Sequence, residues 1–189
     1  MNKLYLCLSF LMGAVVLISN YLVQFPVNHF GLSKIFTYGA FSYPIAFLIT
    51  DLSNRSFGKI QARKIVYFGF IIGVIFTLFV STNFKDIISI RIVIGSGTAF
   101  LVAQLIDISV FDRYRKSNKW YVPPLFSSLV GSVIDTFLFF FISFYGTTMP
   151  WITLSLGDLA VKIVVSITML LPFRLLTSIF KENHLYKNL

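Results

Sequence analysis

The chain has 189 residues, of which 57% are hydrophobic, 17% are aromatic and only 12% are charged, and its mean hydropathy is +0.83. A soluble domain carries about 25% charged residues, so this composition excludes a water-soluble globular domain and predicts a helical membrane protein. The net charge of +9 would suit a nucleic-acid-binding protein, but the cations lie between apolar runs, where they indicate membrane topology.

Six apolar segments, each close to the roughly 20 residues that a helix needs to cross a bilayer, follow one another along the chain. They cover about residues 4–25, 35–52, 65–82, 89–111, 122–144 and 150–173. Gly39 and Pro44 interrupt the second segment, and a kinked or broken helix is expected there. The pattern predicts an all-α integral membrane protein with six transmembrane helices in one domain, residues 1–189.

The basic residues between these segments indicate how the helices are oriented. Of the 16 lysines and arginines, twelve flank one side of the predicted spans, and only Lys34 and Lys85 flank the other. The twelve are Lys3, Arg55, Lys59, Arg63, Lys64, Arg113, Arg115, Lys116, Lys119, Arg174, Lys181 and Lys187. Cytoplasmic loops carry the excess of basic residues, so both termini are expected in the cytoplasm. These loops are expected to contact anionic lipid of the bilayer, and no nucleic-acid partner is expected.

Four ionisable residues lie inside the predicted spans, where each costs roughly 2.5–3.5 kcal/mol at a helix centre. They are two acids and two bases: Arg91, Asp135, Asp158 and Lys162. Asp158 and Lys162 are one helical turn apart, which favours an ion pair within the sixth span. Asp135 falls near the middle of the fifth span. Such residues are expected either to bind a substrate or ion or to fix helix register as buried ion pairs.

Polar side chains of other spans add to the predicted site. Asn20 and Gln24 close the first span on the outer side, where Arg91 begins the fourth. The polar groups therefore converge on the outer half and the centre of the membrane and predict a pocket open to the exterior. Asp51 and Asp107 are expected at the cytoplasmic helix ends instead, as structural partners of arginines in the adjacent loops. These arginines are Arg55, Arg113 and Arg115.

An enzyme is not expected. His29 and His184 are far apart, so they do not form the zinc-binding pattern His-Glu-x-x-His, and no cofactor is implied by any motif. Asp135 and Asp158 on adjacent spans superficially fit an intramembrane aspartyl protease, which is the least favoured alternative. Such an enzyme needs a Gly-x-Gly-Asp motif, whereas residues 155–158 of this chain are Ser-Leu-Gly-Asp.

Five stretches in colinear order resemble the queuosine precursor transporter family, which is also called the vitamin uptake transporter family. They are SNYLVQFPV (19–27), YGAFSYPIAFLITDLSNRSFGK (38–59), QLIDISVFDRYRK (104–116), GSVIDTFLFFFISF (131–144) and DLAVKIVVS (158–166). The resemblance implies a six-helix importer of the bacterial inner membrane that carries 7-cyano-7-deazaguanine or a close analogue, for salvage into queuosine of transfer RNA. It also places the family's charged residues at Arg91, Asp135, Asp158 and Lys162.

The chemistry of such a base agrees with these residues. A deazaguanine presents a ring N–H beside an exocyclic amine, two donors that one carboxylate accepts together, and Asp135 is the first candidate for that carboxylate. The neighbouring carbonyl oxygen of the base needs a donor, which can come from Lys162, Arg91, Asn20 or Gln24. The aromatic side chains available for stacking are Tyr38, Phe41, Tyr43 and Phe137.

The sequence leaves the energy source of such transport open. A protonatable aspartate could couple uptake to a proton gradient. The chain has no Walker motif, so ATP would have to be used by a partner, as in the alternative of a substrate-binding subunit of an energy-coupling-factor-type vitamin transporter. A facilitator with metabolic trapping of its substrate is the third option, and assembly into a homo-oligomer is equally open.

Overall fold

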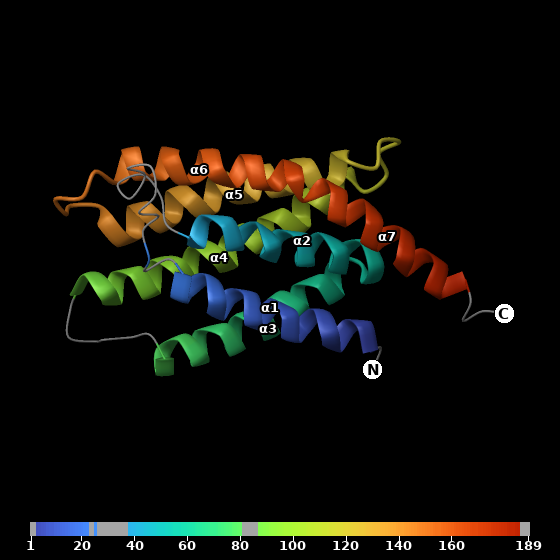
Figure 1. The fold of residues 1–189 in the computed structure, drawn as a ribbon, viewed down its shortest axis with the longest axis horizontal. Helices are drawn as coiled ribbons and strands as arrows, with labels where there is room; N and C mark the ends of the chain where they lie inside the picture. Colours follow the sequence, from blue (N-terminus) through green and yellow to red (C-terminus); the bar gives the residue numbers. More distant parts are fainter. Residues whose placement is uncertain (1–2, 23–24, 26–37, 81–86, 186–189) are drawn as a thin grey trace.

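The computed structural model describes residues 3–22, 25, 38–80 and 87–185, and over these residues every regular element is a helix (Figure 1). Seven helical segments follow one another: α1 (Lys3–Leu22), α2 (Gly39–Phe57), α3 (Lys59–Val80), α4 (Ile87–Tyr114), α5 (Val122–Phe144), α6 (Trp151–Thr168) and α7 (Leu170–Leu185). The predicted all-α fold class is confirmed. Gln24 lies outside the described residues, and so does the side chain of Asn20, whose backbone belongs to α1.

Three helices of the described part are long and apolar enough to cross a bilayer. They comprise Ile90–Tyr114 in α4, Val122–Phe144, which is α5, and Trp151–Ile179, which runs from α6 into α7. The apolar part of α1, Lys3–Ser19, is shorter. These helices lie lengthwise in one bundle, in which α4 and α5 pack along each other more extensively than any other pair (Figure 1).

The irregular second segment forms one helix. α2 begins at Gly39 and continues through Pro44 without a break, so of the two expected outcomes, a kinked or a broken helix, the broken helix is wrong. The helix ends at Phe57, five residues beyond the predicted span, and is followed by Gly58, whose φ of +83° is readily adopted only by a residue without a Cβ. The N–H of Gly58 donates to the carbonyl of Asn54 at 2.9 Å and closes the last turn.

The last predicted span bends where α6 passes into α7. Pro172 has no N–H to donate to the carbonyl of Thr168 four residues earlier, so the helical ladder is interrupted there. The bonds on either side persist, because Met169 N–H donates to Val165 at 2.9 Å and Phe173 N–H donates to Met169 at 3.1 Å. α7 consequently points away from the bundle axis at the end where the chain also begins (Figure 1).

Small residues set how closely the helices approach. A Cβ on Gly69 or Gly73 of α3 would clash with Met12 or Val16 of α1, and a Cβ on Gly95 of α4 would clash with Ser143 of α5. Glycine at these positions therefore allows the backbones of neighbouring helices to come into contact, as it does between membrane helices in general.

The interior of this bundle is unusually polar and its surface unusually apolar. α2 packs against every other helical segment and buries Thr50, Asp51, Ser53 and Asn54 together with its apolar residues. Large apolar side chains of α5, α6 and α7 are exposed instead, among them Phe141, Ile152, Leu156, Val164 and Leu171. A polar interior and an apolar surface suit a protein surrounded by lipid rather than by water. The buried polar residues gather in two clusters, at different positions along α5.

Candidate functional site

A lysine and two aspartates meet inside the bundle between α5 and α6. Lys162 Nζ lies 2.8 Å from Asp135 Oδ2 and 2.6 Å from Asp158 Oδ2, so one ammonium group bridges two carboxylates. The three residues, called the charged triad below, are exposed by only 3%, 3% and 7% respectively. Burial strengthens their attraction, which must offset the cost of removing all three charges from water. With every group ionised, the triad holds one more negative charge than positive.

Two further side chains tie the triad to the helices around it. Thr136 Oγ1 donates a hydrogen bond to Asp158 Oδ2 at 2.9 Å and accepts one from Lys162 Nζ at 3.1 Å. The Lys162 ammonium also lies 5.2 Å from the ring centroid of Tyr43 on α2, which is within the range of cation–π attraction. Three helices, α2, α5 and α6, therefore meet at the triad.

Helical periodicity explains why α6 presents two of the three charges. Ser155, Asp158, Lys162 and Ser166 recur every three or four residues and share one face of the helix. They are also the residues that α6 buries, while the rest of the helix is apolar apart from Thr153 and Thr168. The predicted ion pair between Asp158 and Lys162 is confirmed by the structure.

A glycine lets α2 approach α5 next to Asp135. Asp135 shares the buried face of α5 with Ser128, Gly131 and Ser132. The ring of Phe47 from α2 packs directly on Gly131, and any side chain there would collide with this ring. The close contact brings α2, and Tyr43 one turn before Phe47, against the side of α5 that carries the aspartate.

A small cavity adjoins the triad. Its lining comes from four helices and consists of Gly39, Ala40, Tyr43, Ser96, Asp135, Phe139, Asp158 and Lys162. The free space is about that of one water molecule, so a bicyclic base fits only if the surrounding helices move apart. Ser96 of α4 is a lining residue that the sequence analysis missed. Its one sequence signal is a hydroxyl between two glycines, in Gly95-Ser96-Gly97.

Arg91, the fourth intramembrane charge, is not part of the triad. Its Nε donates to the carbonyl of Ile142 at 3.1 Å and its Nη2 donates to the carbonyl of Tyr145 at 2.7 Å. Arg91 thereby binds the last carbonyls of α5, where a cation also interacts favourably with the helix dipole. These carbonyls lie seven or more residues beyond Asp135, roughly 10 Å along the helix.

Of the predicted stacking residues, the structure brings Tyr43 to the triad. Phe137 is 38% exposed on the outer surface of α5, where it lines an apolar hollow with Phe141 and Trp151. Tyr38 and Phe41, near the start of α2, are 38% and 45% exposed.

The arrangement of the two triad carboxylates also differs from the proton-sharing pair of an aspartyl protease. Asp135 and Asp158 each bind Lys162, so both are held by a cation rather than sharing a proton between them. Within the described residues, no group of three or more His, Cys, Asp or Glu side chains is placed to hold a metal ion.

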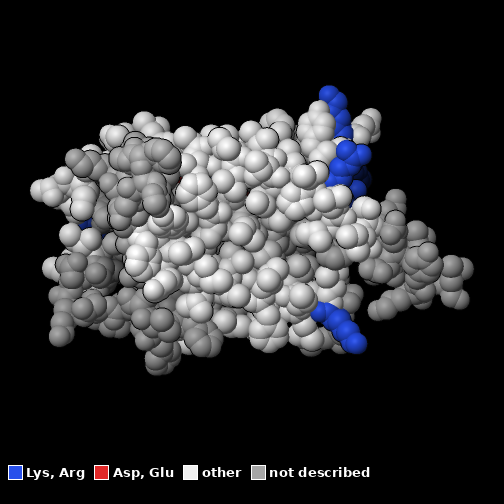
Figure 2. All heavy atoms as spheres, viewed as in Figure 1, with Lys and Arg blue, Asp and Glu red and all other residues white. Residues whose placement is uncertain are grey.

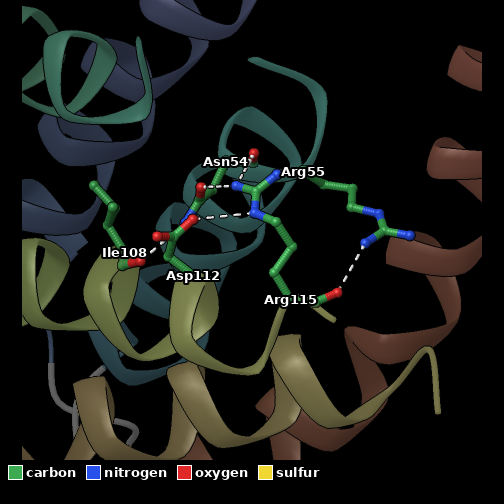
Figure 3. A network of polar contacts seen from close by, with 5 residues as sticks. All are labelled: Asn54, Arg55, Ile108, Asp112 and Arg115. Atoms are coloured by element: carbon green, nitrogen blue, oxygen red, sulfur yellow. Dashed lines mark hydrogen bonds and ion pairs between the residues drawn. The ribbon is translucent and has the colours of Figure 1, made fainter. Parts of the chain in front are cut away.

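A second polar network joins α2 to the end of α4 (Figure 3). Arg115 Nε binds Asp112 Oδ1 at 3.1 Å, and its Nη2 donates to the backbone carbonyl of Asn54 at 2.6 Å and to the Asn54 side-chain oxygen. The Asn54 amide donates in turn to the carbonyl of Ile108 at 3.0 Å, and Arg55 donates to the carbonyl of Arg115 at 3.4 Å. The arginines of this region are thus bound by Asp112, Asn54 and backbone carbonyls.

The prediction that Asp51 and Asp107 pair with these arginines is wrong. Asp51 instead accepts hydrogen bonds from Ser127 at 2.8 Å and from Ser128 at 3.2 Å, both on α5. Asp107 is fully buried, and neither of its carboxylate oxygens has a hydrogen-bond partner among the residues that the structure describes. Arg55 lies one turn after Asp51, but its side chain is exposed while the aspartate faces α4 and α5.

Comparison with known proteins agrees with a membrane protein. Residues 37–177 match a family model described as "Putative vitamin uptake transporter". The chain is 35% identical over 176 residues to the "Queuosine precursor transporter" of Escherichia coli, an alignment that covers 84% of this chain and 79% of the relative. The chain belongs to the queuosine precursor transporter family. It is therefore a membrane transporter and not an enzyme.

Two further members of the queuosine precursor transporter family are similar to this chain. The "Probable queuosine precursor transporter" of Haemophilus influenzae is 34% identical over 195 residues, covering 87% of this chain and 82% of the relative. The protein of the same name from Bacillus subtilis is 25% identical over 177 residues, covering 82% and 76%. No solved structure matches the chain. The segment matched by the family model contains the whole charged triad and Arg91, whereas Asn20 and Gln24 precede it.

Proposed function

We propose that this protein imports a queuosine precursor, 7-cyano-7-deazaguanine or a close analogue, across the bacterial inner membrane, and that the charged triad binds it. The observation that carries the proposal is the buried cluster of Asp135, Asp158 and Lys162 beside a cavity, with two carboxylates for one ammonium. The names of the relatives from Escherichia coli and Haemophilus influenzae support the choice of substrate class.

The triad has two carboxylates and one ammonium group, so it favours a ligand that donates hydrogen bonds. A deazaguanine offers its ring N–H and exocyclic amine to one carboxylate, and charge-assisted hydrogen bonds of this kind are the strong ones. Asp135 is suited to this role because its side chain lines the cavity and comes from a different helix than Lys162. Ser96 lines the same cavity and supplies a donor for the carbonyl oxygen of the base. Lys162 can add a second donor only by giving up one of its present acceptors, because its three hydrogens bind Asp135, Asp158 and Thr136. The ring of Tyr43 supplies a flat apolar face there.

The proposed topology has six membrane spans with both termini in the cytoplasm. α1 begins and α7 ends at the same end of the molecule (Figure 1). Lysine and arginine side chains gather mainly at that end on the face shown in Figure 2. Basic residues are retained on the cytoplasmic side of membrane proteins, which supports the orientation. In this orientation Arg91 and the α5–α6 connection face the exterior, so the triad is reached from outside through the α2, α4 and α5 ends.

Uptake of labelled 7-cyano-7-deazaguanine by cells that cannot synthesise the precursor tests the function. Cells that produce this protein should accumulate the label and convert it into modified transfer RNA, and cells without it should not. Equal uptake in both would contradict the proposal. Uptake that requires the ATPase of a co-produced energy-coupling module would instead identify the chain as the substrate-binding subunit of such a transporter.

Asp135→Asn tests the site in the same assay. The amide keeps the size of the side chain but presents an N–H₂ group to a substrate that also donates there. Loss of a hydrogen bond to a charged group costs roughly 1.5–3 kcal/mol, so uptake at low substrate concentration should fall about 10- to 150-fold. Asp112→Asn makes the same exchange on α4 outside the triad, in a side chain that is 37% exposed, and should leave uptake nearly unchanged. Full uptake by the Asp135 variant would remove this residue from the site.

A further inference from the structure

The triad is not the only buried acidic cluster of the bundle. Asp51 of α2 and Asp107 of α4 are exposed by 2% and 0%, and their carboxyl groups lie beside each other. Each lies six or seven residues before the end of its helix, so the carboxyl groups sit roughly 10 Å inside the helix ends. Two carboxylates at such depth are costly unless a cation neutralises at least one of them.

The hydrogen atoms available around this pair satisfy only one of its members. Ser127 donates to one oxygen of Asp51 and Ser128 to the other, at 2.8 and 3.2 Å. Ser127 also lies beside Asp107, but its single hydroxyl hydrogen cannot serve both carboxylates. Within the described part of the chain, both oxygens of Asp107 consequently lack a hydrogen-bond donor. The side-chain nitrogen of Gln104, one turn earlier, lacks an acceptor there. A hydrogen on either carboxyl would complete the pair, because the protonated acid donates to the other.

No protein cation neutralises the pair among the described residues. The ion pairs there join Arg115 to Asp112 and Lys162 to its two triad aspartates. Arg55 donates to a backbone carbonyl, and Arg174 of α7 stacks over the ring of Trp120. Arg91 of α4 donates to carbonyls at the end of α5. The remaining lysines and arginines with described side chains are exposed or half-buried: Lys3, Lys59, Arg63, Lys64, Arg113, Lys116 and Lys119. Three tyrosines at this end, Tyr5, Tyr114 and Tyr121, pack against the aromatic rings of Phe57, Phe126 and Trp120 respectively.

We infer that Asp51 and Asp107 are the proton-coupling site of this transporter: the pair binds one proton from one side of the membrane and releases it to the other in each import cycle. The inference rests on the proposed import function and names its energy source. With the proton bound, one carboxyl donates to the other and holds α2 against α4. When the proton leaves, two adjacent carboxylates repel each other, and this contact opens.

The same helices connect this pair to the triad. α2 carries Tyr43 at the triad and Asp51 eight residues later, and α5 carries Asp135 there and Ser127 eight residues earlier. Eight residues of helix span roughly 12 Å, so a rigid movement of α2 against α4 and α5 changes both places at once. The cavity beside the triad is too small for a base in this structure, which is consistent with a site that opens only in another state of the cycle.

Transport in liposomes separates substrate passage from its coupling to protons. Purified protein would be reconstituted with the membrane potential clamped by potassium and valinomycin, and labelled 7-cyano-7-deazaguanine would be added. Exchange of label against unlabelled substrate inside reports passage alone. An imposed gradient of two pH units, acidic outside, supports roughly hundredfold accumulation at one proton per substrate. We expect both exchange and pH-driven accumulation, together with acidification of the lumen when substrate enters.

Two neutral variants locate the proton. Asp107→Asn places an amide where the protonated acid would be and can still donate to Asp51, so the protein should fold and exchange substrate within about twofold of the unsubstituted rate. Accumulation under the pH gradient should fall to the level of equilibration, a loss of up to about a hundredfold. Asp51→Asn should behave in the same way. Asp112→Asn, with the same exchange five residues after Asp107, is the matched control and should keep full accumulation.

The outcomes separate failure of coupling from failure of the proposed function. pH-driven accumulation by the Asp107 and Asp51 variants equal to that of the unsubstituted protein would overturn the inference. Accumulation driven by a sodium gradient at equal pH, or substrate entry without acidification of the lumen, would overturn it as well, and neither measurement depends on a variant that folds. Absence of exchange by the unsubstituted protein would contradict the import function itself.

Discussion

The two buried acidic clusters of this bundle hold similar groups in opposite ways. In the triad, Lys162 lies within 2.8 Å of both carboxylates, so its ammonium group balances one of the two negative charges. In the pair of Asp51 and Asp107, serine hydroxyls bind one carboxyl, and no group among the described residues donates a hydrogen bond to the other. A cluster with its own cation keeps a fixed shape, which suits recognition of a ligand. A cluster without one depends on a cation from outside, which suits coupling.

The largest expected effect on this contrast comes from Lys162→Met. Removing the ammonium leaves two carboxylates buried together without a cation, so the triad would then resemble the pair of Asp51 and Asp107. Breaking a buried ion pair costs roughly 3–5 kcal/mol, so the melting temperature in detergent should fall sharply and uptake should be lost. Lys116→Met, at an exposed lysine, is the control and should change neither. An unchanged melting temperature at position 162 would show that the triad does not stabilise the fold.

A smaller effect is expected from Thr136→Val, which keeps the shape of the side chain and removes its hydroxyl. The hydroxyl donates to Asp158 and accepts from Lys162, so its loss frees one acceptor and one donor of the triad. Hydrogen bonds to charged groups contribute roughly 1.5–3 kcal/mol. Stability should fall by about that amount, in a denaturation measured at constant detergent. The combination with Lys162→Met should lose less than the sum of the two single changes, because the residues share one network. Strict additivity would contradict the network.

Arg91→Ala distinguishes a helix-end contact from a member of the site. The guanidinium donates to the last carbonyls of α5 and is only partly buried, so its removal should lower the free energy of unfolding by roughly 0.5–1.5 kcal/mol. Substrate affinity, measured by equilibrium binding, should stay within about threefold of the unsubstituted protein. A loss of binding as large as that of Asp135→Asn would place Arg91 at the substrate in another state of the transport cycle. Arg63→Ala, at an exposed arginine of α3, serves as the reference.

The smallest change in stability is expected from Asp107→Asn. Replacing an unpartnered acid by an amide that donates to Asp51 removes a charge and adds a hydrogen bond, so the melting temperature should stay the same or rise. The same exchange at Asp135 takes a carboxylate away from Lys162 and should lower the melting temperature. Comparing the two variants in one detergent checks the contrast directly. A lower melting temperature for Asp107→Asn than for Asp135→Asn would contradict it.

The sequence was informative wherever a feature repeats along one helix. The spacing of Ser155, Asp158, Lys162 and Ser166 predicts the buried face of α6 and the ion pair on it. The composition predicts the all-helical fold, because a soluble domain of this length could not bury so much apolar surface and the alternative is a helical membrane protein. Both inferences need only local periodicity or total composition, which a single sequence contains.

Contacts between helices far apart in the sequence could not be predicted in this way. Asp135 reaches Lys162 across 27 residues, and Asp51 reaches Ser127 across 76. The rotation of each helix about its axis decides such contacts, and it depends on which small residues meet, as Gly131 meets Phe47. The spacing of Asp51 and Arg55 allowed an ion pair along α2, but packing turned the aspartate inward. Arg91 had the right charge for the triad but begins α4 beside the end of α5.

Equilibrium binding of labelled 7-cyano-7-deazaguanine to the purified protein tests the central claim most directly, because it needs neither a gradient nor a cell. Three proteins would be compared at one pH: the unsubstituted chain, Asp135→Asn and Asp107→Asn. If the triad is the substrate site and the pair of Asp51 and Asp107 is not, the Asp135 variant should bind at least about tenfold more weakly. The Asp107 variant should bind like the unsubstituted protein. Equal binding by the Asp135 variant would contradict the account.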